Sequence, residues 1–353
     1  MTHQPCTCCI IPPNMLRLLA EAACDEADRC RLLDQAELSA RLRDQRCAVP
    51  PPAATPATAA GAVALAIAPG KQRGVYDAAT ESTLPGTLVR DEGGAAVTDE
   101  AANQAYDGAG LAYDFFRQVL KRRSIDGQDM RIDSTIHYQQ QFNNAFWNGQ
   151  QMVYGDGDGK LFIGFTHSID VIAHELTHGL IQHAVPGGLN YEGQSGALNE
   201  SIADVFGSVV KQWSLKQSSR QADWLIGAGI MAPDVGKALR SLADPGNREL
   251  TWSGDDQPKT LAGYVEDGSV HNNSGIPNHA FYAACMALKG NSWSRAAPIW
   301  YAALALLTPD ATFADMARAT VQTAARLYGA DSSAQRAVQA AWQVAGIDGK
   351  EIR

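Results

Sequence analysis

The chain of 353 residues lacks any run of about 18 consecutive apolar residues, the length that a membrane-spanning helix requires. Positive charge is also scarce, because 29 lysines and arginines stand against 38 aspartates and glutamates, for a formal net charge of -9. Nucleic acids and anionic membranes attract clustered positive charge, so neither is an expected partner. The first residues lack a basic segment followed by an apolar one, so no ordinary secretory signal is visible.

Cysteine is nearly missing from the later part of the chain. Of the seven cysteines, six lie at or before Cys47, and only Cys285 follows. An internal disulfide beyond residue 48 is therefore excluded. The N-terminal cysteines are interpreted first as reduced thiols of a segment made in the cytosol.

Composition divides the chain into regions of different periodicity. Residues 14–46 carry leucine and alanine at helical spacing, which predicts one or two amphipathic helices. A proline- and alanine-rich segment from Ala48 is typical of a protease-sensitive linker. Short β-branched and aromatic segments over about 72–165 predict an irregular antiparallel sheet, interrupted by one helix over 102–123. Helical patterns dominate after residue 168, so the expected fold class is α+β.

Two histidines and two carboxylates have the spacing of a metal centre. The segment HELTH places His174 and His178 four residues apart, so both imidazoles can reach one cation from a helix. In GALNESIADVFG, Glu200 can complete a zinc site while Asp204, four residues later, accepts an N–H from a ligand imidazole. The alternatives are an ordinary pair of surface histidines and a solvated carboxylate face. The apolar neighbours of the carboxylates disfavour the second alternative.

Four motifs together resemble the thermolysin-like neutral zinc metalloproteases. Between about residues 74 and 345 the chain contains, in order, NNAFWNGQQMVYGDGDG, VIAHELTHGL, GALNESIADVFG and VHNNSGIPNHAF. Near the N-terminus, CIIPPNML resembles the short propeptide of the protealysin-like branch. The resemblance implies a two-lobed catalytic domain, with a β-rich lobe over 73–170 and an α-helical lobe over 171–353. A propeptide over 1–50 and a linker with a processing site over 51–72 would precede it.

The same resemblance supplies a mechanism. Zinc on the two histidines and Glu200 would activate a water molecule, and Glu175 would act as its general base. His271 and Tyr191 are expected to stabilise the oxyanion. Taken alone, these last two residues would more often be a loop histidine and a packing tyrosine.

Substrate-binding groups are likewise implied. Asn144 and the backbone of Ala145 would bind an extended substrate as an added strand, and Arg240 would hold a substrate carbonyl. Four apolar residues, some of which could equally belong to the core, would line the pocket for the residue after the scissile bond: Phe162, Phe165, Val171 and Leu239. We therefore expect cleavage before leucine, isoleucine, valine or phenylalanine.

Two positions depart from the family pattern. Glu266 stands five residues before His271, where the family has the aspartate that orients this histidine, and Asp267 beside it could take that role instead. Lys211 occupies a position where calcium-rich relatives have a carboxylate, although Asp170 is retained. A lysine ammonium would repel a cation and could replace it, so the double calcium site of those relatives is doubtful here.

The predicted function is that of a zinc-dependent endopeptidase made as a proenzyme. A zinc aminopeptidase and a catalytically silent zinc-binding relative are the alternatives. Its partners would be protein and peptide substrates and its own propeptide, with no nucleic acid and no membrane. The resemblance favours secretion by a non-classical route, and cytoplasmic retention is the alternative. A thiolate of the N-terminal segment that reaches the zinc and keeps the enzyme latent is the alternative interpretation of the cysteines.

Overall fold

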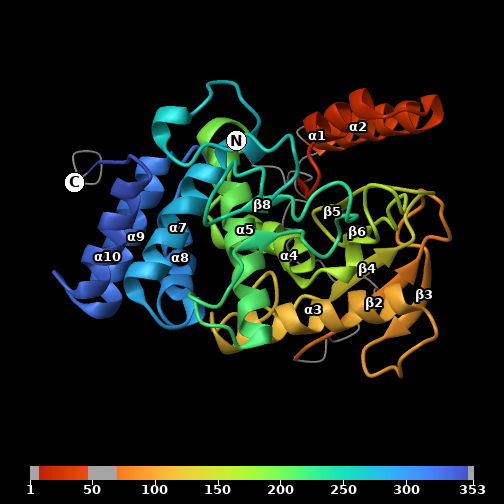
Figure 1. The fold of residues 1–353 in the computed structure, drawn as a ribbon. Coiled ribbons are helices and arrows are strands. Elements are labelled where there is room, and N and C mark those ends of the chain that lie inside the picture. Colours follow the sequence, from red (N-terminus) through yellow and green to blue (C-terminus); the bar gives the residue numbers. More distant parts are fainter. Residues whose placement is uncertain (1–7, 47–69, 349–353) are drawn as a thin grey trace.

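The computed structural model describes residues 8–46 and 70–348 (Figure 1). The expected linker with its processing site, over 51–72, lies almost entirely outside the described residues. Within the described parts, no helix is long and apolar enough to cross a membrane.

A six-stranded sheet forms one half of the molecule, in the order β1-β5-β6-β4-β2-β3 (Figure 1). Strand β4 runs parallel to both β2 and β6, and the other neighbouring pairs are antiparallel. The expectation of an irregular antiparallel sheet was therefore wrong in the direction of β4, because the sheet is mixed. The physical reason is the helix α3 (Glu100–Gln118), which crosses between β3 and β4 and brings the chain back in the direction of β2. The strands are β1 (Cys8–Cys9), β2 (Arg73–Asp77), β3 (Thr87–Asp91), β4 (Ile132–Ile136), β5 (Ala145–Trp147) and β6 (Met152–Tyr154).

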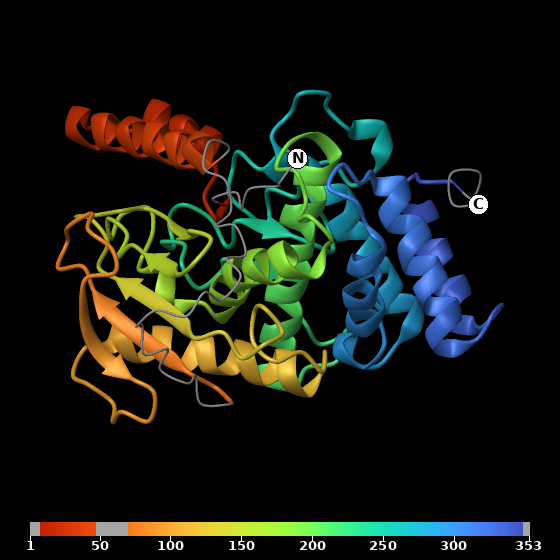
Figure 2. The ribbon, with the colours of Figure 1, turned by 180° about the vertical axis from the view of Figure 1, so that it is seen from behind.

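Two long helices run through the centre, between the sheet and the C-terminal helices (Figures 1 and 2). Helix α4 (Ile169–Ala184) is buried over most of its length, as its largely apolar sequence predicts. Gly187 and Gly188, with φ of 84° and 74°, then turn the chain through a conformation that favours glycine. Helix α5 (Gly193–Leu215) follows and packs against α4, as expected from the break at this turn.

The C-terminal half is helical, and its core includes Trp300 stacked on Trp342 with 6.1 Å between ring centroids. A short antiparallel pair, β7 and β8, lies between α5 and these helices in the sequence. The α-helices and strands of this half are β7 (Leu225–Ile226), β8 (Arg240–Ser241), α6 (Val270–Asn273), α7 (Gly275–Leu288), α8 (Ala296–Ala303), α9 (Phe313–Tyr328) and α10 (Ser333–Val344). The short 3-10 helices of the chain are η1 (Phe165–His167), η2 (Leu261–Gly263), η3 (Ser292–Ser294) and η4 (Leu304–Leu306).

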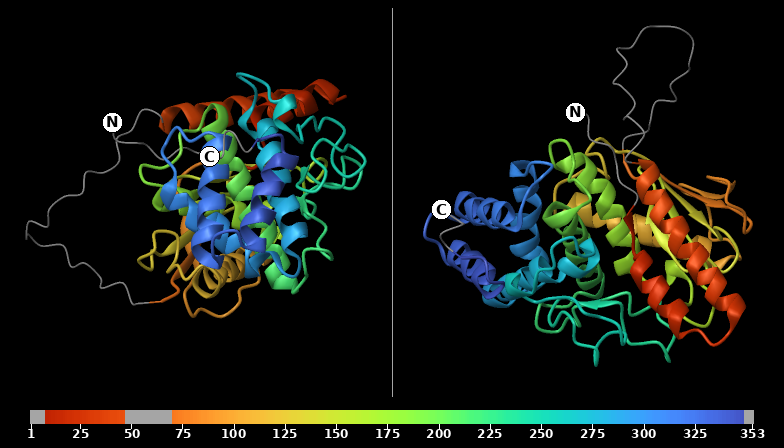
Figure 3. Two further views of the ribbon diagram at one scale, coloured as in Figure 1. Left: turned by 90° about the vertical axis from the view of Figure 1, so that its left-hand side faces the viewer. Right: turned by 90° about the horizontal axis from the view of Figure 1, so that it is seen from above.

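Residues 8–46, here called the N-terminal segment, consist of β1 and a hairpin of two helices, α1 (Pro13–Ala22) and α2 (Glu26–Arg46). The left panel of Figure 3 shows the hairpin lying across the top of the molecule. Strand β1, which precedes the hairpin, pairs with β5. Two ion pairs connect the hairpin to the loop after β6: Lys160 Nζ lies 2.6 Å from Asp28 Oδ2, and Arg31 Nη2 lies 3.3 Å from Asp158 Oδ2.

Candidate active site

The two histidines of the HELTH motif lie side by side on α4. Their Nε2 atoms are 3.0 Å apart, and both side chains are buried. The other nitrogen of each ring has an oxygen partner, because His174 Nδ1 lies 2.9 Å from Asp204 Oδ1 and His178 Nδ1 lies 2.8 Å from Asn199 Oδ1. A carboxylate can only accept, so Asp204 places the proton of His174 on Nδ1 and leaves its Nε2 lone pair facing the second ring. Two facing lone pairs repel unless a cation lies between them.

Helix α5 adds a carboxylate to this pair. Glu200 Oε2 lies 3.6 Å from His174 Nε2, and Glu200 Oε1 lies 3.7 Å from His178 Nε2. Glu200 is fully buried, and its Oε2 also lies 3.2 Å from His271 Nε2. Two imidazoles and one carboxylate that converge in a buried site are the donor set of a catalytic zinc site. The residues present therefore fit zinc.

Behind the histidines, Asp204 is held by a network of donors. Arg240 donates to it through Nε and Nη2, at 2.9 and 2.8 Å, and Asn278 Nδ2 donates at 2.9 Å. Burial alone would raise the pKa of Asp204, but the Arg240 guanidinium and His174 outweigh it and lower the pKa. Asp204 is therefore ionised and fixes the orientation of the His174 ring.

Glu175 lies beside the metal ligands on α4 and is completely buried. Its Oε2 accepts a hydrogen bond of 2.9 Å from the Trp147 N–H of β5. Burial, followed by the neighbouring Glu200 carboxylate, raises the pKa of Glu175 well above its usual value. A carboxyl group with a raised pKa beside a metal site is suited to accept and return a proton.

The N-terminal segment occupies the cleft along β5. Beyond the β1–β5 pairing, the Ile10 N–H donates to the Ala145 carbonyl at 3.2 Å. The Asn144 side chain bonds Ile11 twice, since Oδ1 accepts from the Ile11 N–H at 3.0 Å and Nδ2 donates to the Ile11 carbonyl at 2.9 Å. The side chain and backbone expected to bind an extended substrate thus bind this segment as an added strand.

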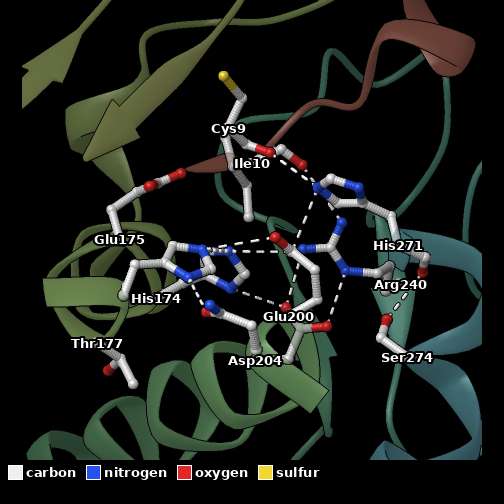
Figure 4. A network of polar contacts seen from close by, with 12 residues as sticks. Cys9, Ile10, His174, Glu175, Thr177, Glu200, Asp204, Arg240, His271 and Ser274 are labelled. Carbon is white, nitrogen blue, oxygen red and sulfur yellow. Dashed lines mark hydrogen bonds and ion pairs between the residues drawn. The ribbon is translucent and has the colours of Figure 1, made fainter. Parts of the chain in front are cut away.

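On the opposite side of the cleft, two cationic or polar side chains reach the same backbone (Figure 4). Arg240 Nη1 donates to the Ile10 carbonyl at 3.3 Å, and His271 Nε2 lies 2.9 Å from the Cys9 carbonyl oxygen. Tyr191 lies next to His271, with 6.3 Å between ring centroids, and its hydroxyl donates to Glu200 Oε1. The expected catalytic residues therefore converge around the Cys9–Ile10 peptide.

The four residues expected to line the specificity pocket are all buried in the main core cluster. Leu239 lines a small hollow together with Pro12, Met15 and His271. The other three are fully buried in the main core, where the rings of two of them pack at 5.6 Å: Phe162, Phe165 and Val171. Ile10 belongs to the same core cluster and is also completely buried.

Two other expected positions lie farther from the metal ligands. Glu266 and Asp267 are exposed in the loop before α6, so which of them orients His271 stays a prediction. Lys211 Nζ lies 3.0 Å from Asp170 Oδ2, 2.9 Å from Asp223 Oδ1 and 2.6 Å from the Leu225 carbonyl. Burial would lower the pKa of Lys211, but the two carboxylates outweigh it and raise the pKa.

Three further groups hold the site together and were not expected from the sequence. Asn199 holds the His178 ring, Asn278 supports Asp204, and the Trp147 backbone holds Glu175. Each of them lies within one of the motifs that resemble the family, and this position could have pointed to it: Asn199 in GALNES, Asn278 in GIPNHAF and Trp147 in NNAFW.

A two-lobed α+β fold with a buried histidine–histidine–glutamate centre, and a second glutamate beside it, defines a metallopeptidase. The family model described as "Thermolysin metallopeptidase, catalytic domain" matches residues 66–182, and "Thermolysin metallopeptidase, alpha-helical domain" matches 187–347. The chain belongs to the thermolysin family of metallopeptidases.

Similarity to three known proteins supports this family assignment. An "Extracellular metalloprotease" of Pectobacterium carotovorum subsp. carotovorum is 42% identical over 97% of this chain and 96% of its own length. A "Thermolysin" of Alicyclobacillus acidocaldarius subsp. acidocaldarius is 40% identical over 77% of this chain and 50% of its own length. The solved precursor of protealysin from Serratia proteamaculans superposes on this chain with a TM-score of 0.83 and is 41% identical in sequence. The match covers 97% of this chain and 100% of the solved chain. The predicted fold class and the predicted metalloendopeptidase made as a proenzyme are thereby confirmed.

Proposed function

We propose that this proenzyme, once active, hydrolyses internal peptide bonds on the N-terminal side of large apolar residues. The observation that carries the proposal is the Cys9–Ile10 peptide in the cleft. Its carbonyl oxygen lies 2.9 Å from His271 Nε2, and the residue that follows it, Ile10, is completely buried. A bound substrate with the same backbone path would place its scissile carbonyl at His271 and an apolar side chain where Ile10 lies.

Each residue has a definite role in this proposal. His174, His178 and Glu200 hold zinc, which when bound lowers the pKa of a water molecule and polarises a carbonyl. Glu175 accepts a proton from the attacking water and passes it to the leaving amine. His271 and Tyr191 donate hydrogen bonds to the oxyanion that develops on the substrate.

Internal cleavage is favoured over aminopeptidase activity by the course of the N-terminal segment. The chain continues on both sides of the Cys9–Ile10 peptide, with Cys8 paired to Trp147 on one side and Ile11 bound by Asn144 on the other. A cleft that accepts backbone in both directions suits an internal peptide bond. An aminopeptidase cleft needs instead an acidic anchor for a free amine.

The first experiment compares Glu175→Ala with the unchanged chain and with Glu249→Ala, which alters an exposed glutamate. All three are first cut by an added serine protease that is then inactivated. Removal of the general base should lower kcat/KM on an internally quenched peptide with blocked ends by about 10²–10⁴-fold, while zinc content stays the same. Chelation should abolish activity and added zinc should restore it.

Two outcomes of this experiment would contradict the proposal. Full activity of Glu175→Ala would contradict the proposed mechanism, in which Glu175 is the general base. Equal cleavage of peptides with leucine and with aspartate after the scissile bond would contradict the proposed specificity. An apolar pocket should reject a charged side chain.

We also propose the division of the chain that the sequence suggests. Residues 1–50 are a propeptide, removed by cleavage within 51–72, and residues 73–170 and 171–353 are the two lobes of the enzyme. The relative named an extracellular metalloprotease supports secretion, and the route by which this chain would leave the cell is proposed to be non-classical.

Calcium is proposed to be unnecessary at the Asp170 position. The buried ammonium of Lys211 pairs with Asp170 and Asp223 and bonds a backbone carbonyl, the contacts that a bound cation would otherwise make. We expect the thermal unfolding midpoint of the zinc-loaded protein to be the same with and without added calcium. A midpoint that rises with added calcium in the unchanged chain would refute this.

A further inference from the structure

The small hollow beside Leu239 lies where the N-terminal segment passes from the cleft into its helical hairpin. One wall is formed by this segment, through Pro12, Asn14 and Met15. The opposite wall belongs to the C-terminal half, and includes Leu239 and residues of the loop before η2 and of α6. Removal of the N-terminal segment adds the space of its three residues to the hollow and opens the hollow to a substrate.

The backbone contacts of the segment show which substrate residue would reach this hollow. The Cys9 carbonyl oxygen lies 2.9 Å from His271 Nε2, so Ile10 is the first residue after the peptide that stands in for the scissile bond. Ile11 is the second and Pro12 is the third, and Pro12 lines the hollow. A substrate with the same backbone path places its third residue there.

The wall that a substrate would face combines apolar surface with a carboxylate. Leu239 and the half-buried Trp252 contribute the apolar part. Asp256 lines the same hollow, is exposed, and accepts one hydrogen bond from the Asn272 side chain. An ionised carboxylate can accept several hydrogen bonds. A lysine or arginine side chain suits such a wall, because its methylene stem packs on apolar surface while its charged head meets the carboxylate.

The other charged groups that line the hollow are held by neighbours. The Arg240 guanidinium is bound to Asp204 by hydrogen bonds of 2.9 and 2.8 Å, so this pair adds little net charge. Asp255 is buried and accepts from the Gln257 N–H at 3.1 Å and from the Thr251 hydroxyl at 2.8 Å. Burial raises the pKa of Asp255 above its usual value. The negative charge that a substrate would meet is therefore mainly that of Asp256.

An amide oxygen adds a second acceptor to this wall. Gln257 lines the hollow and is buried, and its Nε2 donates to the His271 carbonyl at 2.6 Å and to Ser274 Oγ at 3.2 Å. Its Oε1 has no hydrogen-bond partner among the described residues. Buried polar atoms are nearly always hydrogen-bonded, so this oxygen suits a donor supplied by a ligand.

We propose that this hollow is the subsite for the third residue after the scissile bond, and that Asp256 makes the enzyme favour lysine or arginine at that position. This specificity rests on the proposed endopeptidase function. The competing explanation is that Asp256 only holds Asn272 and thereby the short helix α6, which carries His271. A purely structural role would change the cleavage of all peptides alike, whereas a subsite changes the preference for charge.

The experiment uses internally quenched peptides with blocked ends and leucine directly after the scissile bond. Their third residue is lysine, methionine, which resembles the lysine stem without its charge, or glutamate. Each chain is first cut by an added serine protease that is then inactivated. The unchanged chain should cleave the lysine peptide with a kcat/KM about 2–5-fold above that of the methionine peptide, and the glutamate peptide below both. The difference should lie mainly in KM and should shrink as salt is added.

Three variants separate the subsite from a structural role. Asp256→Asn should bring the lysine-to-methionine ratio close to one, and Asp256→Lys should favour the glutamate peptide. The matched control is Glu249→Gln, which removes an exposed negative charge of the same loop from a residue outside the hollow and should keep the original ratio. Each ratio compares two peptides on one protein, so a general loss of activity cancels.

Equal cleavage of the three peptides by the unchanged chain would overturn the subsite but not the endopeptidase function. A lysine preference that survives in Asp256→Lys would overturn the role of Asp256. A processed chain that cleaves none of the peptides would overturn the proposed endopeptidase function, and the subsite with it.

Discussion

At the scale of single residues, the orientation of each imidazole depends on one oxygen that contacts its Nδ1. His178 has Asn199 Oδ1 at 2.8 Å, and both residues are buried. We expect Asn199→Leu to weaken zinc binding by about 10–100-fold, since loss of such an outer partner leaves the ring orientation and tautomer unfixed. Competition with a coloured zinc chelator measures the affinity.

Asn199→Asp is the matched control for this change, because it has nearly the same shape and keeps an oxygen that can accept from His178. Its zinc affinity should stay near that of the unchanged chain. If both variants bound zinc equally, the Asn199 contact would have no role in holding the metal ligand.

The residues that the sequence could and could not predict differ in what brings them to the site. Asp204 could be predicted, because it lies four positions after Glu200 and so shares its helix face. Asn199 directly precedes Glu200 and points in another direction along the helix. Its contact with His178 follows only from the way α5 crosses α4. The place of Cys8 depends on the register of β1 with β5, which no spacing within the N-terminal segment indicates.

At the scale of elements, the periodic helices could be predicted and the direction of the strands could not. Apolar spacing within α4 or α9 is local information, and the expected helices at these positions are present. Strand β4 pairs in parallel with β2, whose sequence lies more than 50 residues earlier. Alternation within a strand predicts which face is buried but carries no information about the direction of its neighbour.

His137 connects three elements of the β-rich half through two carboxylates. It follows β4, and its Nε2 lies 2.8 Å from Asp99 Oδ2, whose side chain also caps the N-terminus of α3. Its Nδ1 lies 2.8 Å from Asp156 Oδ1 in the loop after β6. The hydrogen bond to Asp156 has the largest effect on the pKa of His137 and raises it. Burial lowers this pKa, but together with the hydrogen bond to Asp99 the net result is a pKa of about 9.

This raised pKa predicts a pH-dependent stability. The folded state holds the His137 proton more tightly than the unfolded state, whose pKa is about 6.5. The contribution of protonated His137 to the free energy of unfolding is therefore complete below about pH 6.5 and is lost as pH rises through about 9. Because the side chain is partly exposed, we expect a loss on the order of 1 kcal/mol in the free energy of unfolding.

Urea unfolding of the chain with Glu175→Ala, at about pH 6 and pH 9.5, tests this contribution. His137→Gln should reduce the difference between the two pH values by about that amount, whereas His167→Gln, which changes an exposed histidine, should not. An unaltered pH difference in His137→Gln would show that the histidine gains no proton affinity on folding.

At the scale of the whole molecule, one cleft cannot hold the N-terminal segment and a second peptide together. Ile10 and Ile11 already take the hydrogen bonds of Asn144, Ala145 and Arg240. The proposed processing site within 51–72 could therefore be cut only by a molecule whose cleft has become empty. The first active molecules should then cut the remaining proenzyme, so that processing accelerates as it proceeds.

We expect a time course of processing with a lag that shortens as protein concentration rises and nearly vanishes when processed enzyme is added. The chain with Glu175→Ala should stay full length alone but be cut by added processed enzyme, because its own catalytic base is missing while its processing site is intact. Gel electrophoresis of samples taken over time measures both. A lag-free, first-order time course at a rate independent of concentration would mean instead that each molecule cuts itself, and that the N-terminal segment leaves its own cleft without help.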